Sequence, residues 1–374
     1  MDGRALVSTR KGLFTLARGR DGWGVERVDF LGTPVSMALA DSRDGTLYAA
    51  HDNGHFGAKL HRRDPGGNDW RELVPPAFPK IEAAAKAPQV EADRDGGNGK
   101  APAVTLVWEL VAGPAERPGE IWAGTIPGGL FRSRDRGESW ELVESLWNAP
   151  ERARWFGGGK DEPGIHSIVV DPRDGDSLTL AISCGGVWKT GDAGASWTNV
   201  GRGMRASYMP PDQAEDIVSQ DPHRLALCPA APDVMWVQHH DTRFRSTDGG
   251  RTFVEIGSKP PSVFGFAVAA HPSDPATAWF VPAVKDEYRY PTDGRMVVAR
   301  TRDGGESFEE LAAGLPQTHA YDLVYRHGLA VDADGSTLVM GSTSGGVWLS
   351  EDAGDSWAAL DARLPPVYAV AFAG

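Results

Sequence analysis

The stretch Ser133-Arg-Asp135-Arg-Gly137-Glu-Ser139-Trp140 decides the fold of this chain, because four more copies of its pattern follow. Each copy has Ser or Thr first, Asp third, Gly fifth, Ser or Thr seventh and an aromatic residue eighth. The other copies span residues 190–197, 246–253, 301–308 and 350–357. Repeats with a period of about 50 residues are typical of propellers and solenoids.

The repeated residue types predict a tight turn in a β-hairpin. Hydroxyl and carboxylate oxygens accept hydrogen bonds from backbone N–H groups, Gly tolerates a positive φ, and the aromatic ring packs between neighbouring sheets. Apolar strands precede the turn, as in residues 128–131, 185–188 and 345–348. Two more strands upstream give four strands per repeat, which is one propeller blade. The Asp residues of these turns are therefore predicted to stabilise hairpins rather than to catalyse a reaction.

Two eroded copies, at residues 19–23 and 63–70, raise the number of repeats from five to seven. Residues 4–30 supply only three strands, whereas residues 367–373 form a lone apolar strand at the C-terminus. Pairing of these ends completes one blade and removes exposed sheet edges. We therefore predict an all-β fold: a single seven-bladed β-propeller of four-stranded antiparallel blades, closed by pairing of the C-terminal strand with the N-terminal strands.

The predicted boundaries place residues 1–374 in one domain. Blade 1 combines residues 4–30 with 366–373, and blades 2 to 7 are expected at about 34–73, 104–143, 164–200, 222–256, 262–311 and 319–360. Three long insertions join the outermost strand of one blade to the innermost strand of the next, at 74–103, 145–163 and 201–221. Loops of this length are uncommon unless they are functional or disordered, so we predict lids over the central funnel.

The composition limits the classes of partner. The chain of 374 residues has a formal net charge of −13, so nucleic acid or an anionic membrane surface would be repelled. Cys184 and Cys228 are the only cysteines, and no apolar N-terminal run resembles a signal peptide. We expect a cytoplasmic protein with buried, reduced thiols. Its expected partner is a small-molecule substrate, and the composition also allows a protein partner.

Histidines gather at one face of the predicted propeller. In the strand register above, eight of the ten histidines fall at the face opposite the Asp turns. Imidazole suits Zn, Mn, Ni, Fe and Cu, so one interpretation is a divalent metal site in the funnel. The predicted ligands are His51, His166, His223 and His239, with His319 as a fifth member of the pool. The alternative is that these side chains hydrogen-bond neighbouring loops or bind an anionic ligand without metal.

Two further inferences concern the same face. His239 and the adjacent His240 would point in opposite directions on a strand, so only one of them can face the axis. Histidine titrates near neutral pH and serves as a general acid or base. The polar residues to which we assign catalytic roles at this face are His319, Tyr321, Asp322, Lys285, Asp286, Arg10 and Arg326.

The repeated turn resembles the Asp-box, or BNR, repeat of sialidases and related propellers, and the whole chain is similar to bacterial BNR-repeat, exo-sialidase-like and glycosyl hydrolase-like proteins. The sialidase resemblance implies three arginines that clamp a substrate carboxylate, a Tyr and Glu pair and an acidic Asp. The matching positions would be Arg10, Arg205 and Arg326 for the clamp, Tyr321 with Glu109 or Glu287 for the pair, and Asp286 for the acid. The chain departs from that family because it lacks the Arg-Ile-Pro motif and has seven predicted blades rather than six. The repeat therefore transfers the fold better than the activity.

Three hypotheses about function follow. The first is an Asp-box propeller enzyme, a hydrolase or lyase, that acts on a small polar or anionic substrate such as a sugar derivative in a His-rich funnel, with a divalent metal. The second is a sialidase-like glycoside hydrolase that uses carboxylates and arginines. The third is a non-catalytic scaffold or ligand-binding propeller.

Overall fold

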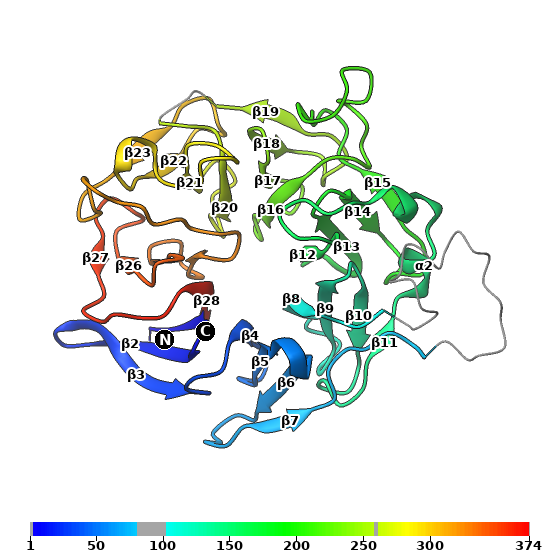
Figure 1. Cartoon of the computed structure of the whole chain (residues 1–374), viewed down its shortest axis with the longest axis horizontal. Helices are drawn as coiled ribbons and strands as arrows, with labels where there is room; N and C mark the ends of the chain where they lie inside the picture. The colour runs from blue at the N-terminus through cyan, green and yellow to red at the C-terminus, as the bar shows by residue number, and fades with distance from the viewer. Residues whose placement is uncertain (1–2, 81–101, 258–260, 374) are drawn as a thin grey trace.

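The strands form a ring of sheets around a central axis (Figure 1). The structure is a computed structural model that describes residues 3–80, 102–257 and 261–373. Within these residues there are seven four-stranded antiparallel sheets, and each is one blade. The predicted fold class is confirmed.

One strand of each blade lies nearest the axis, and these innermost strands pack against one another around the ring. From the axis outward, blade 1 consists of β28 (Val367–Ala373), β1 (Arg4–Thr9), β2 (Gly12–Gly19) and β3 (Gly22–Asp29), blade 2 of β4 (Val35–Ala40), β5 (Leu47–Asp52), β6 (Ala58–Arg63) and β7 (Arg71–Leu73), and blade 3 of β8 (Leu106–Ala112), β9 (Ile121–Ile126), β10 (Leu130–Ser133) and β11 (Glu141–Leu142). Blade 4 consists of β12 (Ile165–Asp171), β13 (Asp174–Ile182), β14 (Gly186–Thr190) and β15 (Thr198–Val200), and blade 5 of β16 (Pro222–Leu227), β17 (Met235–His239), β18 (Arg243–Ser246) and β19 (Val254–Ile256). Blade 6 consists of β20 (Gly265–Ala270), β21 (Ala278–Pro282), β22 (Val298–Thr301) and β23 (Glu309–Leu311), and blade 7 of β24 (Leu329–Val331), β25 (Leu338–Gly341), β26 (Val347–Ser350) and β27 (Ala358–Ala359).

Helical turns are short and lie in the connections. They are η1 (Gly54–Phe56), α2 (Glu144–Trp147), η2 (Pro150–Arg154) and η3 (Thr292–Gly294). In the part of the chain that the structure describes, no helix has the length and apolar character needed to span a bilayer.

The ring closes through its two ends. β28 pairs antiparallel with β1, from Arg4 opposite Ala373 to Ser8 opposite Ala369. Figure 1 shows both termini in this one blade. The pairing gives β1 a partner on each side and completes the four strands of the first blade.

Tryptophans on the second strands fill the space between blades. Trp122 of β9, Trp236 of β17 and Trp279 of β21 are all completely buried. Each packs against apolar residues of the next blade, as Trp122 does against Ile168 and Leu178. Because one large ring joins two sheets, each blade stabilises its neighbour.

The Asp turns have the predicted structure. In the copy at 133–140, the Asp135 carboxylate accepts a hydrogen bond from the Ser139 N–H at 2.9 Å, and the Ser133 hydroxyl accepts one from the Gly137 N–H at 2.8 Å. The Arg136 N–H donates to the Gly119 carbonyl in the β8–β9 turn of the same blade. The Asp turns therefore lie on the face that carries the turns between first and second strands.

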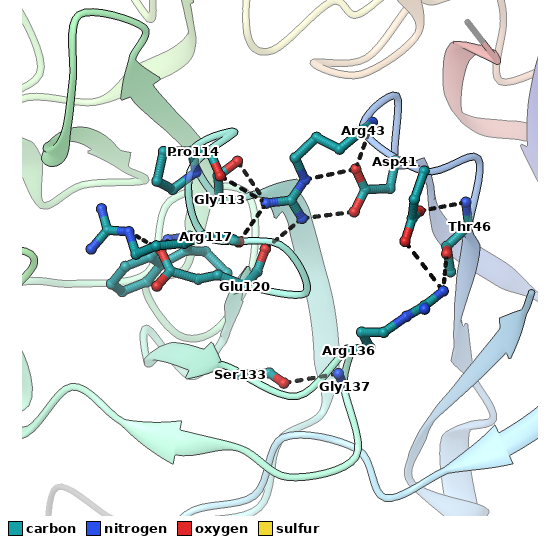
Figure 2. A network of polar contacts seen from close by, with 12 residues as sticks. Asp41, Arg43, Thr46, Gly113, Pro114, Arg117, Glu120, Ser133, Arg136 and Gly137 are labelled. Carbon is teal, nitrogen blue, oxygen red and sulfur yellow. Dashed lines mark hydrogen bonds and ion pairs between the residues drawn. The ribbon is translucent and has the colours of Figure 1, made fainter.

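On this same face Arg43 joins blades 2 and 3. Figure 2 shows Arg43, from the β4–β5 turn, held by the Asp41 carboxylate at 2.7 and 2.8 Å. The rest of its guanidinium donates hydrogen bonds to four carbonyl oxygens around the β8–β9 turn. These carbonyls belong to Gly113, Pro114, Arg117 and Glu120. The contact holds two neighbouring turns in register.

Candidate functional site

A cavity of about 130 Å³ opens on the face opposite the Asp turns. Its walls come from the insertions 145–163 and 201–221, from the loops between second and third strands of blades 4, 5 and 6, and from the inner residues of blades 5, 6 and 7. Pockets for drug-sized ligands usually measure about 300–1,000 Å³, so this cavity fits a smaller molecule.

Asp221 lies on the floor of the cavity, just before β16, and is 3% exposed. Its Oδ1 accepts hydrogen bonds from the Cys184 N–H at 3.1 Å and from the Ser183 hydroxyl at 3.3 Å. Its Oδ2 lies 3.4 Å from His223 Nε2 and 3.6 Å from His240 Nδ1. Burial opposes ionisation, but the nearby imidazoles and Arg326 outweigh it and hold the pKa of Asp221 well below its usual value.

His223 is oriented by the backbone of the next blade. Its Nδ1 donates a hydrogen bond to the Gly265 carbonyl at 2.7 Å, and its ring stacks on Phe266 with centroids 4.4 Å apart. Because Nδ1 is engaged with the Gly265 carbonyl, Nε2 is the ring nitrogen that faces Asp221 and that can bind a metal ion when the ring is neutral. Burial lowers the pKa of His223, which favours this neutral form.

His240 completes the cluster from the loop after β17. Its backbone N–H donates to the Asp221 carbonyl at 3.0 Å, and its ring contacts Tyr208 edge-on at 5.0 Å. Burial lowers the pKa of His240, but the Asp221 carboxylate more than compensates, so the pKa lies above its ordinary value.

One ligand atom from each of Asp221, His223 and His240 lies within 4.8 Å of the other two. Two imidazoles and one carboxylate form a donor set that suits Zn, Fe, Mn or Ni and leaves positions open for substrate. The surroundings fit such a cation, because Gly265 fixes the tautomer of His223 while Ser183 holds the second carboxylate oxygen of Asp221.

Two arginines also line the cavity at different depths. Arg326 is 6% exposed, and its guanidinium lies between the rings of Trp108 and Phe266, at 4.9 and 5.4 Å from their centroids. Arg289 lies near the mouth and is paired with Asp286 at 2.5 Å.

Both described insertions cover the cavity and are tied together. Phe156 of the first contacts Tyr208 of the second edge-on at 6.5 Å, and Arg154 forms an ion pair with Asp216. Phe156 also donates its backbone N–H to the Cys184 carbonyl at 3.2 Å. Of the third predicted lid, 74–103, residues 81–101 lie outside the described residues.

Three of the predicted site residues line the cavity: His223, Asp286 and Arg326. The structure does not bring the predicted four-histidine set together. His51 packs in blade 2 against Phe30 and His61, with ring centroids at 4.4 and 4.6 Å. Burial lowers its pKa to about 4.

His166 and His239 are also buried, and neither belongs to the cluster. The His166 Nδ1 lies 3.0 Å from the Ser167 hydroxyl, and burial holds the pKa of His166 well below its ordinary value. The ring nitrogens of His239 face the backbone N–H groups of Asp221 and Asp241, each at 3.2 Å. Of the adjacent pair, His240 and not His239 reaches the cavity.

The remaining predicted catalytic residues lie outside the cavity walls. His319 and Arg10 are exposed, and Tyr321 is 65% exposed. Asp322 accepts a hydrogen bond from the Ser342 hydroxyl at 2.6 Å, and Lys285 pairs with Glu287 at 3.2 Å.

The sialidase-like arrangement is not assembled either. Of the three arginines assigned to the clamp, Arg326 lines the cavity, whereas Arg10 and Arg205 are exposed elsewhere. Glu109 is buried at the axis, where it pairs with Arg224 and lies 3.3 Å from His327 Nε2. Burial opposes its ionisation, but Arg224 and His327 keep the pKa of Glu109 below its ordinary value.

The sequence analysis missed Asp221, His240 and Arg289. Asp221 carried one signal, because it lies two residues before His223 and residues i and i+2 of an extended chain share a face. His240 was placed at the right face, but its neighbour was preferred. Nothing in the local sequence distinguished Arg289 from a solvated surface charge.

No protein-family model matches this chain. Short segments are similar to curated xyloglucanases. A probable oligoxyloglucan-reducing end-specific xyloglucanase of Neosartorya fischeri is 32% identical over 85 residues, covering 22% of this chain and 9% of that protein. The xyloglucanase Xgh74A of Acetivibrio thermocellus is 29% identical over 150 residues, covering 36% and 16%. This chain therefore spans only a small part of these relatives.

Solved structures share the fold. An ancestral GH74 enzyme matches with a TM-score of 0.57 at 15% identity, over 84% of this chain and 36% of its own. YCF48 from Cyanidioschyzon merolae matches with a TM-score of 0.53 at 14% identity, over 94% and 90%. A functionally unknown protein from Desulfotomaculum acetoxidans matches with a TM-score of 0.57 at 9% identity, over 100% and 99%. Identities this low indicate a common propeller architecture, and the specific resemblance to sialidases remains a prediction.

Proposed function

We propose that this protein is an enzyme whose active site is the cavity lined by Asp221, His223 and His240, and that it uses a divalent metal ion to act on a small polar or anionic sugar derivative. The observation that carries this proposal is the approach of three ligand atoms to within 4.8 Å of one another on the cavity floor. Hydrolysis and lyase-type elimination are the reaction classes that a cation with open positions and nearby acid–base groups supports.

A cation held by Asp221 Oδ2, His223 Nε2 and His240 Nδ1 would polarise a substrate oxygen or lower the pKa of a water molecule. The protein's own residues prepare the site for it. The Gly265 carbonyl keeps the proton of His223 on Nδ1, and the Cys184 N–H orients the Asp221 carboxylate. Phe156 and Tyr208 contact each other edge-on and line the cavity beside the site.

The sugar class of the substrate is supported by the xyloglucanase relatives and by the GH74 fold, although the matched segments are short. The cavity is too small for an extended polysaccharide and accommodates a single small ring or an open-chain derivative.

Metal analysis tests the proposal directly. Untagged full-length protein, purified without chelators and then reconstituted with Zn, Mn, Ni or Fe, is expected to bind about one equivalent and to melt at a higher temperature. His223→Gln and His240→Gln should lose this binding, whereas the control His319→Asn, outside the cluster, should keep it. A folded protein that binds none of these metals would overturn the metal assignment.

A second candidate is metal-independent glycoside hydrolysis, because Asp221 and Asp286 line the same cavity. Two carboxylates are the usual requirement of that reaction. A panel of fluorogenic glycosides, assayed with chelator, distinguishes the two candidates. This second function is supported if turnover survives metal removal and is lost in Asp286→Asn. If sialosides are not turned over, that result counts against a sialidase activity.

A further inference from the structure

Arg326 is a buried cation without a bonding partner. Within residues 3–80, 102–257 and 261–373, no group accepts a hydrogen bond from its guanidinium or forms an ion pair with it, and its Nε is completely buried. Buried charged groups are normally paired or hydrogen-bonded, because leaving them unpaired is costly. Arg43 shows the ordinary outcome in this protein, since its guanidinium is saturated by Asp41 and four carbonyls.

The rings around Arg326 restrict how a ligand can reach it. Trp108 and Phe266 lie 4.9 and 5.4 Å from the guanidinium carbon, so aromatic surfaces cover the guanidinium. The N–H groups of Arg326 point outward in the plane of the guanidinium. Arg326 and Asp221 both line the cavity. A planar carboxylate matches this edge, because it accepts two parallel hydrogen bonds from a guanidinium.

The charges of the cavity favour an anion as well. The carboxylates of Asp221 and Asp286 formally cancel the guanidiniums of Arg289 and Arg326. A divalent cation in the cluster would therefore leave an excess of two positive charges in a small cavity. A ligand that carries negative charge neutralises part of this excess.

We propose that Arg326 is the residue that selects the substrate, by binding the carboxylate of a small sugar acid whose hydroxyl oxygens face Asp221, His223 and His240. This inference rests on the proposed function and specifies its substrate class. Arg289 lies at the mouth and is already paired with Asp286, so it contributes less to selection.

The test compares matched probes on metal-loaded, full-length protein by calorimetry and thermal shift. D-Glucuronate and D-gluconate are expected to bind and raise the melting temperature, whereas neutral D-glucose is not. Arg326→Lys, which keeps the charge but loses the planar fork, should weaken glucuronate binding by about 10- to 100-fold. Arg10→Lys is the control, because Arg10 is exposed and lies outside the cavity walls, and its effect should be less than about threefold.

Equal binding of glucose and glucuronate would overturn the inference, as would tighter binding of inorganic phosphate than of either sugar acid. The comparison of probes on the unaltered protein needs no variant to fold. Metal content, measured on every sample, separates the two proposals. If carboxylates bind in an Arg326-dependent way and no metal is bound, the role of Arg326 is supported and the metal site is contradicted. If the metal content is normal and no carboxylate binds, the metal site is supported and the role of Arg326 is contradicted.

Discussion

Gly158 lies so close to Cys184 that a β-carbon at position 158 would be 2.7 Å from the cysteine sulfur. The same β-carbon would approach Ser183 Oγ at 3.2 Å and Asp221 Oδ2 at 3.4 Å. The first insertion therefore packs directly on the groups that orient Asp221. The cavity can keep this shape only because residue 158 has no side chain.

Gly158→Ala should for this reason disturb the cavity, because the added methyl group pushes the insertion away from Cys184 or displaces Asp221. We expect weaker binding of the metal and of sugar acids, by about tenfold or more, with little change in melting temperature of the metal-free protein. Gly159→Ala is a matched control, since nothing lies within 4 Å of its added β-carbon. Equal binding by the two variants would contradict the packing role assigned to Gly158.

His51 should make the protein sensitive to mild acid. Its pKa is about 4 in the folded protein and about 6.5 in an unfolded chain, because the buried ring has no described hydrogen-bond partner. Between these values the unfolded state binds more protons, so stability falls as the pH falls from 6.5 to 4, by about 3 kcal/mol from this residue.

His51→Phe tests this contribution, since a phenyl ring can occupy the space beside Phe30 and His61 without titrating. Urea unfolding between pH 7 and 4 should show a smaller loss of stability in the variant than in the unaltered protein. His319→Asn, which removes an exposed imidazole, should leave the slope unchanged. Parallel curves for His51→Phe and the unaltered protein would count against the assignment.

Arg43 should matter for stability and not for binding. Arg43→Lys removes the planar guanidinium that joins Asp41 to the carbonyls of the neighbouring turn (Figure 2). We expect a loss of about 2–4 kcal/mol in unfolding free energy with unchanged metal content. Arg134→Lys is the control, because its ion pair with Glu141 is exposed and should contribute less than about 1 kcal/mol.

The Asp turns should behave as structural elements. Asp303 accepts hydrogen bonds from the Ser307 N–H at 3.0 Å and from the hydroxyls of Ser307 and Thr301. Asp303→Ala should cost about 1–3 kcal/mol of stability while leaving metal and ligand binding intact. Glu306→Ala changes an exposed residue of the same turn and should have little effect. A loss of activity in Asp303→Ala at normal stability would contradict this view.

Part of the site was visible in the sequence, and the part that was missed has a physical explanation. His223, Asp286 and Arg326 were identified because the blade register alone places them at one face. The register could not decide between His239 and His240, since that choice depends on which ring meets the backbone of the turn. It also could not show that His51 is enclosed by Phe30 and His61 from other strands.

The sequence by itself determined the ring of seven blades, because each Asp turn is held by hydrogen bonds within eight residues and each hairpin repeats them. Interactions between residues this close along the chain can be predicted from the sequence pattern. Only the tertiary structure decided the site, because Asp221, Arg289 and Arg326 meet through the closure of the ring and the docking of two insertions. Contacts between distant segments depend on side-chain packing across blades, which no local pattern specifies.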